Sequence, residues 1–210
     1  MKENIRLKTL ISISLLIFSL PFLQTCSDKS LKNSPTYKSE FTGLVEDSIN
    51  TKIVYNEVTK INDTIRNYVE VSKIEKHKII AKDKIEKEIW LKNSKKEFTH
   101  NAYFLGFESY KNFEIRFFAD KTFYMMLNFT LIIIFTFIMF LISFRKKFKQ
   151  IIIMSSLNLV FLFTATILMC FWEQIEDIRQ IKYGYFLFVL NSILIITESG
   201  KECKILKTKT

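Results

Sequence analysis

The chain has 210 residues, a net charge of +10 and only four glycines and two prolines, so it holds few of the residues that tight turns and catalytic loops use. Its apolar residues are concentrated between positions 122 and 197, which leaves little for a water-soluble core. Most of the positive excess flanks hydrophobic segments, where it sets membrane orientation, and no basic face of the kind that binds nucleic acid is visible. We therefore expect a membrane protein without a nucleic-acid partner.

Residues 1–26 have the layout of a targeting segment. Three basic residues precede an apolar stretch over residues 10–23, which is short for a spanning helix and typical of the core of a signal peptide. The stretch ends in Leu-Gln-Thr-Cys at positions 23–26 and is followed by polar residues.

This junction resembles the lipobox of bacterial lipoproteins, with Leu23 at the expected place. The resemblance covers residues 1–26 only and implies lipidation of Cys26, although Gln24 and Thr25 replace the small residues that are usual at their positions. The alternative is an uncleaved signal anchor in which Cys26 is a bystander. In either case the following residues are exported, which indicates a bacterial inner membrane protein.

A polar stretch and a helical pattern are expected on the outer side. Residues 27–42 are polar, contain Pro35 and are predicted to form a tether. Residues 43–121 are predicted to form a small extracytoplasmic domain rich in helix. From Leu44 onward its apolar residues recur at steps of three to five, which approximates a helical face: Val45, Ile49, Ile53, Val58, Ile61, Ile65 and Val69, then Ile74, His77, Ala81, Ile85 and Ile89.

Two acid-before-base pairs spaced four apart, Asp83/Lys87 and Glu88/Lys92, support a helix in the second of these stretches. A long helix or a helical hairpin over residues 44–92 is therefore favoured, and it could pair as a coiled coil. The β-branched content around residues 68–71 leaves a strand alternative open. Aromatic residues over positions 102–118 favour the membrane interface, or one arm of a hairpin that turns at residues 111–112.

Membrane spans are expected in the C-terminal half, giving an all-α membrane protein. Residues 122–144 and 151–172 are uninterrupted apolar runs of 23 and 22 residues, each long enough to cross a bilayer. Residues 183–197 form a third run of 15 residues, about 22 Å long as a helix. This run spans if Ile181 joins it and Lys182 snorkels, or if the bilayer thins locally; otherwise it is re-entrant or interfacial.

Charges in the short loops predict the orientation. Residues 145–150 carry four basic groups and no acid, whereas residues 173–182 carry a net negative charge. The positive-inside rule places the first loop in the cytoplasm and the second outside. The tail, residues 198–210, then lies inside, and residues 27–121 lie outside.

Each span contains one asparagine: Asn128, Asn158 and Asn191. An amide in hydrocarbon needs a hydrogen-bond partner, so we expect these residues to pack helices together. Counted from the ends of their spans, the three asparagines lie at different depths in the membrane. No span contains a charged residue. Both observations argue against a polar pathway through the membrane.

No motif for nucleotide binding, hydrolysis or metal binding is found, and the acidic loop at residues 173–177 is interpreted as a solvated turn. No catalytic residue, metal or cofactor is therefore expected. The predicted function is that of a non-catalytic envelope protein that contacts membrane lipid and whose outer domain binds a protein partner or self-associates through residues 44–92. The alternative is a small oligomeric channel or a subunit of a transport complex.

Overall fold

The structure, a computed structural model, describes residues 5–39, 44–46, 52–56, 61–65, 68–70, 73–110 and 120–207. The chain divides into two compact units: Met1–Asp28 together with Lys95–Thr210, and Lys29–Ser94. The described residues are mostly helical, as the sequence predicts, and they also contain six short strands.

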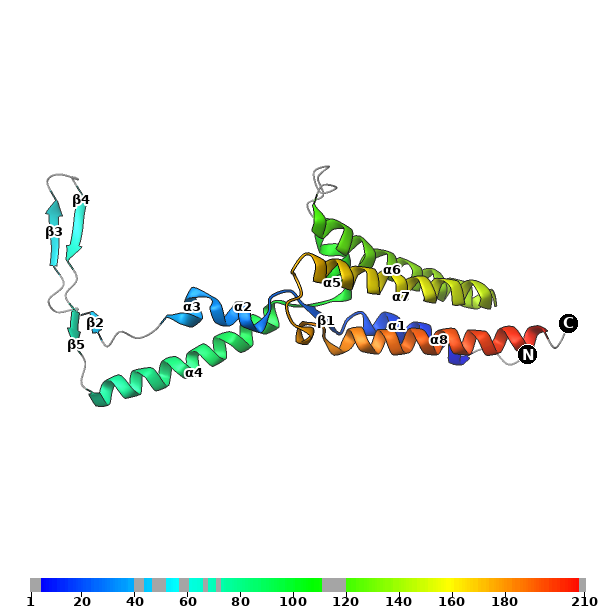
Figure 1. The fold of residues 1–210 in the computed structure, drawn as a ribbon, viewed down its shortest axis with the longest axis horizontal. Coiled ribbons are helices and arrows are strands. Elements are labelled where there is room, and N and C mark those ends of the chain that lie inside the picture. Colours follow the sequence, from blue (N-terminus) through cyan, green and yellow to red (C-terminus); the bar gives the residue numbers. More distant parts are fainter. Residues whose placement is uncertain are drawn as a thin grey trace. The chain divides into compact units, whose positions relative to one another are not determined.

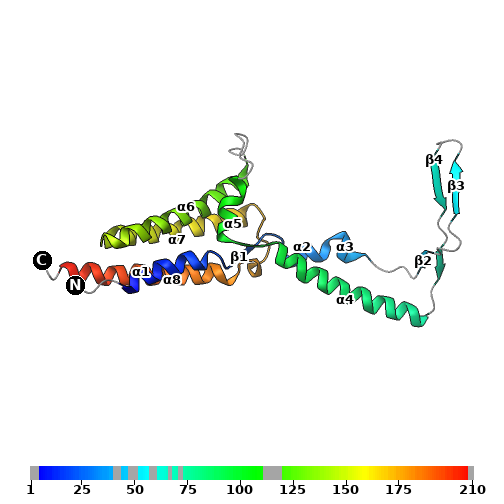
Figure 2. The same ribbon diagram turned by 180° about the vertical axis from the view of Figure 1, so that it is seen from behind.

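Four helices of the first unit form a closed bundle: α1 (Ile5–Ile17), α6 (Lys121–Phe144), α7 (Phe148–Phe171) and α8 (Tyr183–Lys207). Helix α6 contacts α1 and α7, and α8 also contacts α1 and α7, so each helix has two neighbours. In Figures 1 and 2, α1 lies along α8 and α6 lies along α7.

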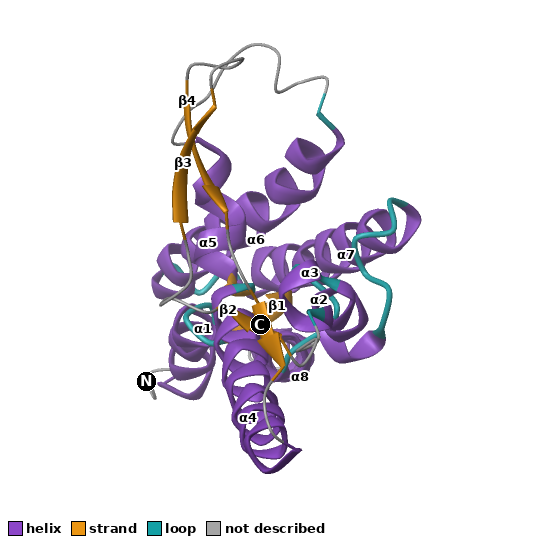
Figure 3. Ribbon diagram, turned by 90° about the vertical axis from the view of Figure 1, so that its left-hand side faces the viewer, coloured by secondary structure: helices purple, strands orange, loops and turns teal. Residues whose placement is uncertain are grey.

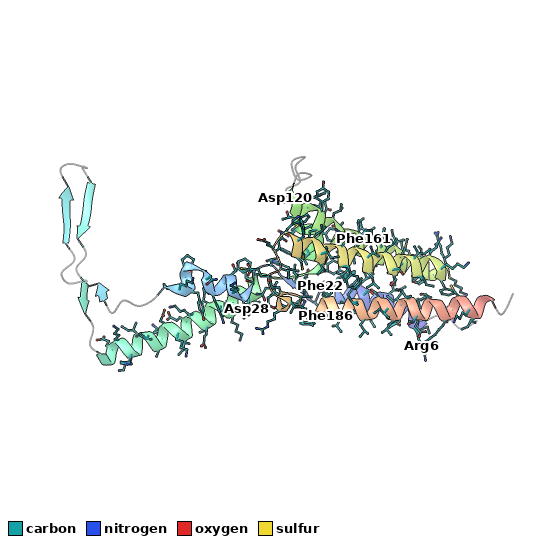
Figure 4. All side chains as sticks on the ribbon, viewed as in Figure 1. Arg6, Phe22, Asp28, Asp120, Phe161 and Phe186 are labelled. Atoms are coloured by element: carbon teal, nitrogen blue, oxygen red, sulfur yellow. The ribbon has the colours of Figure 1, made fainter. Side chains whose placement is uncertain are left out.

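Three of these helices are long and apolar enough to cross a membrane, over Thr122–Phe144, Phe148–Phe171 and Tyr183–Ile205. Many of their outward-facing side chains are apolar, such as Phe186 on α8 (Figure 4), which suits contact with lipid. The first two agree with the predicted spans. The third is 23 residues long rather than 15, because α8 continues through polar residues after Thr197, where Lys201 Nζ lies 2.6 Å from Glu198 Oε1. At about 34 Å, the helix is long enough to cross a bilayer.

The bundle core has two apolar clusters. The larger one surrounds three fully buried phenylalanines, Phe18, Phe22 and Phe188. The smaller one contains Leu7, Ile11, Met139, Phe148, Ile151 and Ile195. Helix α1 contributes to both, so the predicted targeting segment is part of the core.

A small collar closes the end of the bundle that carries the larger cluster. Strand β1 (Pro21–Gln24) pairs antiparallel with β6 (Thr99–Asn101). Helix α5 (Ala102–Phe107) follows, starts where the Asn101 side chain accepts a hydrogen bond from Phe104 N at 2.8 Å, and packs on α6. The 3-10 turns η1 (Glu108–Tyr110) and η3 (Ile178–Gln180) complete the described collar. The hairpin turn expected at residues 111–112 lies outside the described residues.

The second unit contains a hairpin that the helical prediction missed. Strand β2 (Leu44–Glu46) pairs with β5 (Tyr68–Glu70), and β3 (Lys52–Asn56) pairs with β4 (Ile61–Ile65), both antiparallel and one pair nested inside the other. The predicted helical face is therefore wrong in these four strands, and the strand alternative is confirmed in them. The expected face positions Ile49 and Val58 lie outside the described residues. Over such short runs, steps of three to five do not distinguish the repeat of a helix from the alternation of a strand. The β-branched residues, by contrast, favour a strand.

Helices flank this hairpin in the chain. The second of the predicted helical stretches is confirmed as α4 (Lys73–Glu97), 25 residues long. The predicted tether instead contains α2 (Asp28–Asn33) and α3 (Pro35–Lys38). Helix α3 begins where the Ser34 side chain accepts a hydrogen bond from Tyr37 N, with Pro35 in the first turn, which is a favoured start for a helix.

Candidate functional site

A layer of buried polar side chains crosses the middle of the bundle, between the two apolar clusters. Every helix contributes to it, and its members are Ser14, Thr136, Ser155, Asn158, Asn191 and Ser192. Their positions in the chain fit this placement: on α7, for example, Ser155 and Asn158 lie between Ile151 of the smaller cluster and Leu162 of the larger one. Figure 3 shows the structure approximately along the helices.

Four hydrogen bonds of this layer run between helices. Asn158 Nδ2 donates to Thr136 Oγ1 of α6 at 3.0 Å, and Ser155 Oγ donates to the carbonyl of Ser192 on α8 at 3.1 Å. Asn191 Nδ2 donates to Ser14 Oγ at 2.7 Å and to the carbonyl of Leu10 at 2.8 Å, both on α1. The layer therefore links α7 to α6 and α8, and α8 to α1.

Two expectations about the asparagines need correction. Asn158 and Asn191 lie in the same layer rather than at different depths, because α7 begins at Phe148 and α8 extends to Lys207. Asn128 does not bond to another helix in the described structure; its Nδ2 donates at 2.7 Å to the carbonyl of Tyr124, one turn earlier in α6.

A second polar network lies in the collar, around the cysteine that the sequence singles out. The carbonyl of Cys26 accepts a hydrogen bond from Gln24 Nε2 at 2.6 Å. The side chain of Gln180 donates to the carbonyl of Gln24 at 3.0 Å, and Ser27 Oγ donates to Glu176 Oε2 at 2.5 Å. Cys26 itself is half-buried. These bonds join the segment after α1 to the loop between α7 and α8.

An ion pair completes this network. Asp28 Oδ2 lies 2.5 Å from Lys95 Nζ, and its Oδ1 accepts from Gln24 Nε2 at 3.1 Å. Burial acts to raise the pKa of Asp28, but the hydrogen bonds from Lys95 and Gln24 outweigh it and lower that pKa below its usual value. Burial lowers the pKa of the nearby Lys182, against the attraction of Asp28. The carboxylate therefore helps to hold the collar together.

One face of α4 is covered and another is exposed. On the covered face, the ring of Trp90 lies 6.4 Å from that of Tyr37, and Lys87 bonds to the carbonyl of Ser39. On the exposed face, Ile85 and Ile89 are 59% and 54% accessible to solvent. Helices in water normally turn such side chains inward, so this face is a candidate binding surface.

Within the described residues, no group of three or more His, Cys, Asp and Glu side chains could hold a metal ion. His77 lies exposed on α4, and His100 stacks on Phe104 with ring centroids 4.2 Å apart. Comparison of the chain with protein-family models, with curated proteins and with solved structures gives no match.

Proposed function

We propose that this chain is a non-catalytic integral membrane protein of the bacterial inner membrane whose residues 27–121 are exported and bind a protein partner or a second copy. The bundle is its anchor, and residues 44–92 are its binding region. The observation that carries the proposal is the exposed apolar face of α4. A buried polar layer whose hydrogen bonds join neighbouring helices suits an anchor, since these bonds hold the helices together.

The distribution of charge along the bundle supports the orientation. Helix α1 begins beside the end of α6, where Lys8 Nζ lies 4.7 Å from the centroid of the Phe144 ring. The basic loop at residues 145–149 and the lysines of α8 belong to this same end, with Arg6 (Figure 4). The loop between α7 and α8 at the other end carries Glu173, Glu176 and Asp177 against Arg179 and Lys182, so it is net acidic. The positive-inside rule assigns the basic end to the cytoplasm.

The packing of α1 favours retention of the N-terminal segment over its removal. Cleavage before Cys26 would remove β1 and α1, and with them Leu7, Ile11 and Phe18 from the two apolar clusters. It would also leave the amide of Asn191 without its two acceptors inside the membrane. We therefore propose the uncleaved anchor, with Cys26 unmodified in the collar.

Crosslinking in native membranes tests the binding role. The full chain, with Ile85 and Ile89 both changed to Gln, keeps good helix formers in α4 but loses the apolar surface. We expect the wild-type chain to be captured with a crosslinked partner or a second copy, and the double variant to lose at least nine-tenths of that product. The matched control is Ile178→Gln in the collar, an isoleucine that is 73% exposed. Equal capture by all three chains would refute the role of α4.

The channel alternative rests on Asn158, whose Oδ1 is buried without a hydrogen-bond partner in the described structure. An oligomer that lines a pore with this group would conduct ions in reconstituted vesicles and lose the flux in Asn158→Leu. Asn128→Leu is the matched control, since Asn128 bonds only within its own helix in the described structure. Flux in the wild type and control but not in Asn158→Leu would favour the channel over the binding role.

A further inference from the structure

We propose that the exposed face of α4 pairs with α4 of a second copy of this chain, antiparallel and centred on Ile85. This rests on the proposed function and names the partner of the same surface. The apolar stripe runs along Ala81, Ile85 and Ile89, which follow one another every four residues on one side of the helix. All three side chains are exposed.

The charged residues on either side of the apolar stripe favour a second copy of α4 in the antiparallel orientation. Next to Ile85, one flank carries Lys82 and then Glu86, and the other carries Lys84 and then Glu88, so both flanks change from basic to acidic over these positions. The exposed Lys78 and Lys92 lie seven residues before and after Ile85, and they meet a lysine of the second copy in either orientation, so they do not select between the two orientations. Lys82 and Glu86 lie 3.7 Å apart across one turn, and their side chains are 79% and 64% exposed. Both charges are therefore available to a second helix.

Antiparallel pairing makes both flanks complementary. When two copies pack with Ile85 at the centre, like flanks face each other with their directions reversed. Lys82 of each copy then approaches Glu86 of the other, and Lys84 of each approaches Glu88 of the other. Opposite charges at these flanking positions set the orientation of paired helices.

Parallel pairing has the opposite result. In register, the two different flanks face each other, so Lys82 meets Lys84 of the second copy and Glu86 meets Glu88. Four like-charge contacts then replace four attractive ones. The same charges that favour an antiparallel copy therefore disfavour a parallel one.

The fit of the apolar residues agrees with this arrangement. The small Ala81 of one copy faces the larger Ile89 of the other, at both ends of the contact, and the two Ile85 side chains meet in the middle. The stripe is only about 12 Å long, so it buries much less than the roughly 1,600 Å² of a standard interface. We expect a weak pair that crosslinking captures better than sedimentation does.

Disulfide trapping of the full chain in detergent tests the proposal. Copies that carry Ala81→Cys and copies that carry Ile89→Cys, with different tags, are mixed and oxidised in a background where the three native cysteines are changed to Ser. The proposal predicts mixed disulfides, at least tenfold above those formed by Ile178→Cys copies. It predicts few disulfides between two Ala81→Cys copies, because these positions lie about 12 Å apart along the axis, beyond the reach of roughly 7 Å for a disulfide.

The outcomes separate this inference from the proposed function. Disulfides only between like positions would indicate a parallel pair and overturn the proposal, and so would yields no higher than those of the Ile178→Cys control. If the purified chain gives no mixed disulfide while Ile85→Gln/Ile89→Gln still abolishes capture in native membranes, the partner is a different protein and the proposed function survives. Circular dichroism of each variant shows whether α4 remains folded.

Discussion

Gly184 shows at a single position how closely the N-terminal segment fits the bundle. A Cβ built on it would lie 2.6 Å from the carbonyl oxygen of Pro21 and 2.9 Å from Phe22 Cδ2. Backbone cannot move aside as a flexible side chain can, so β1 and the start of α8 would have to separate. A Cβ on Gly200, in the same helix, would meet nothing within 4 Å.

We therefore predict opposite effects of the same substitution at the two sites. Gly184→Ala should destabilise the bundle by about 1–3 kcal/mol through overpacking. Gly200→Ala should stabilise it by about 0.5–1 kcal/mol through helix propensity. Thermal unfolding in detergent measures both. A Gly184→Ala protein that is as stable as the wild type would show that β1 does not pack against α8.

The bond between Asn191 and Ser14 gives a second prediction at this scale. A double-mutant cycle with Asn191→Leu and Ser14→Ala should give a coupling energy of about 0.6 kcal/mol, and at most about 1.7 kcal/mol, as for polar pairs between helices in membranes. The same cycle with Asn128→Leu and Ser14→Ala should give no coupling. Equal coupling in the two cycles would mean that Asn191 does not bond to α1.

Among the elements, α1 differs most from what its sequence indicates. Its apolar residues surround the helix, as in a signal-peptide core, so no pattern shows that one side packs on α6 and α8. That packing depends on side chains more than 100 residues away, such as Phe129 and Phe188. Similarly, the mid-bundle layer could not be predicted. The charged residues after Thr197 made the third span look shorter than α8 is, and so the depth of Asn191 in the bundle was misjudged.

Retention of α1 can be measured directly. With a C-terminal tag, the purified protein should have the mass of the whole chain, and Cys26→Ser should leave that mass changed only by the substitution. A mature protein that begins at Cys26 and carries lipid would contradict the anchor and support the lipoprotein resemblance.

The collar should respond to acid through Asp28. Since the pKa of this carboxyl is lowered in the folded chain, its stabilising effect is present above the ordinary pKa of 3.8 and is lost as the pH falls through the lower folded value. The side chains of Lys95 and Asp28 are 36% and 41% exposed, so water screens the pair and limits its effect to less than about 1 kcal/mol.

We expect Asp28→Asn to unfold at a lower temperature than the wild type at pH 6. The difference should shrink once the pH falls below 3.8 and disappear below the lower folded pKa. Thermal unfolding of both proteins over this range checks it. A difference that persists in acid would mean that the ion pair with Lys95 is not its cause.

For the whole molecule, the sequence sufficed for most of the membrane part and for less of the outer part. Long apolar runs predict α6 and α7 directly, because burial of such residues in lipid dominates their free energy. Over residues 44–70 the spacing of apolar residues fits both a helix and a strand. The pairing of β2 with β5 joins residues more than 20 positions apart, so the local sequence does not reveal it. The spacing of the isoleucines in α4 predicts that they share one face of a helix. The sequence does not predict that this face is exposed.

The central claim is that the basic end of the bundle lies in the cytoplasm while α4 lies outside, and cysteine labelling in intact cells tests it most directly. Ile80→Cys places a thiol on α4, at a side chain that is 46% exposed, and Lys147→Cys places one in the loop between α6 and α7. With a membrane-impermeant thiol reagent, we predict modification at position 80 and none at position 147 until the membrane is opened. Labelling at position 147 but not at position 80 in intact cells would contradict the orientation and, with it, the exported binding surface.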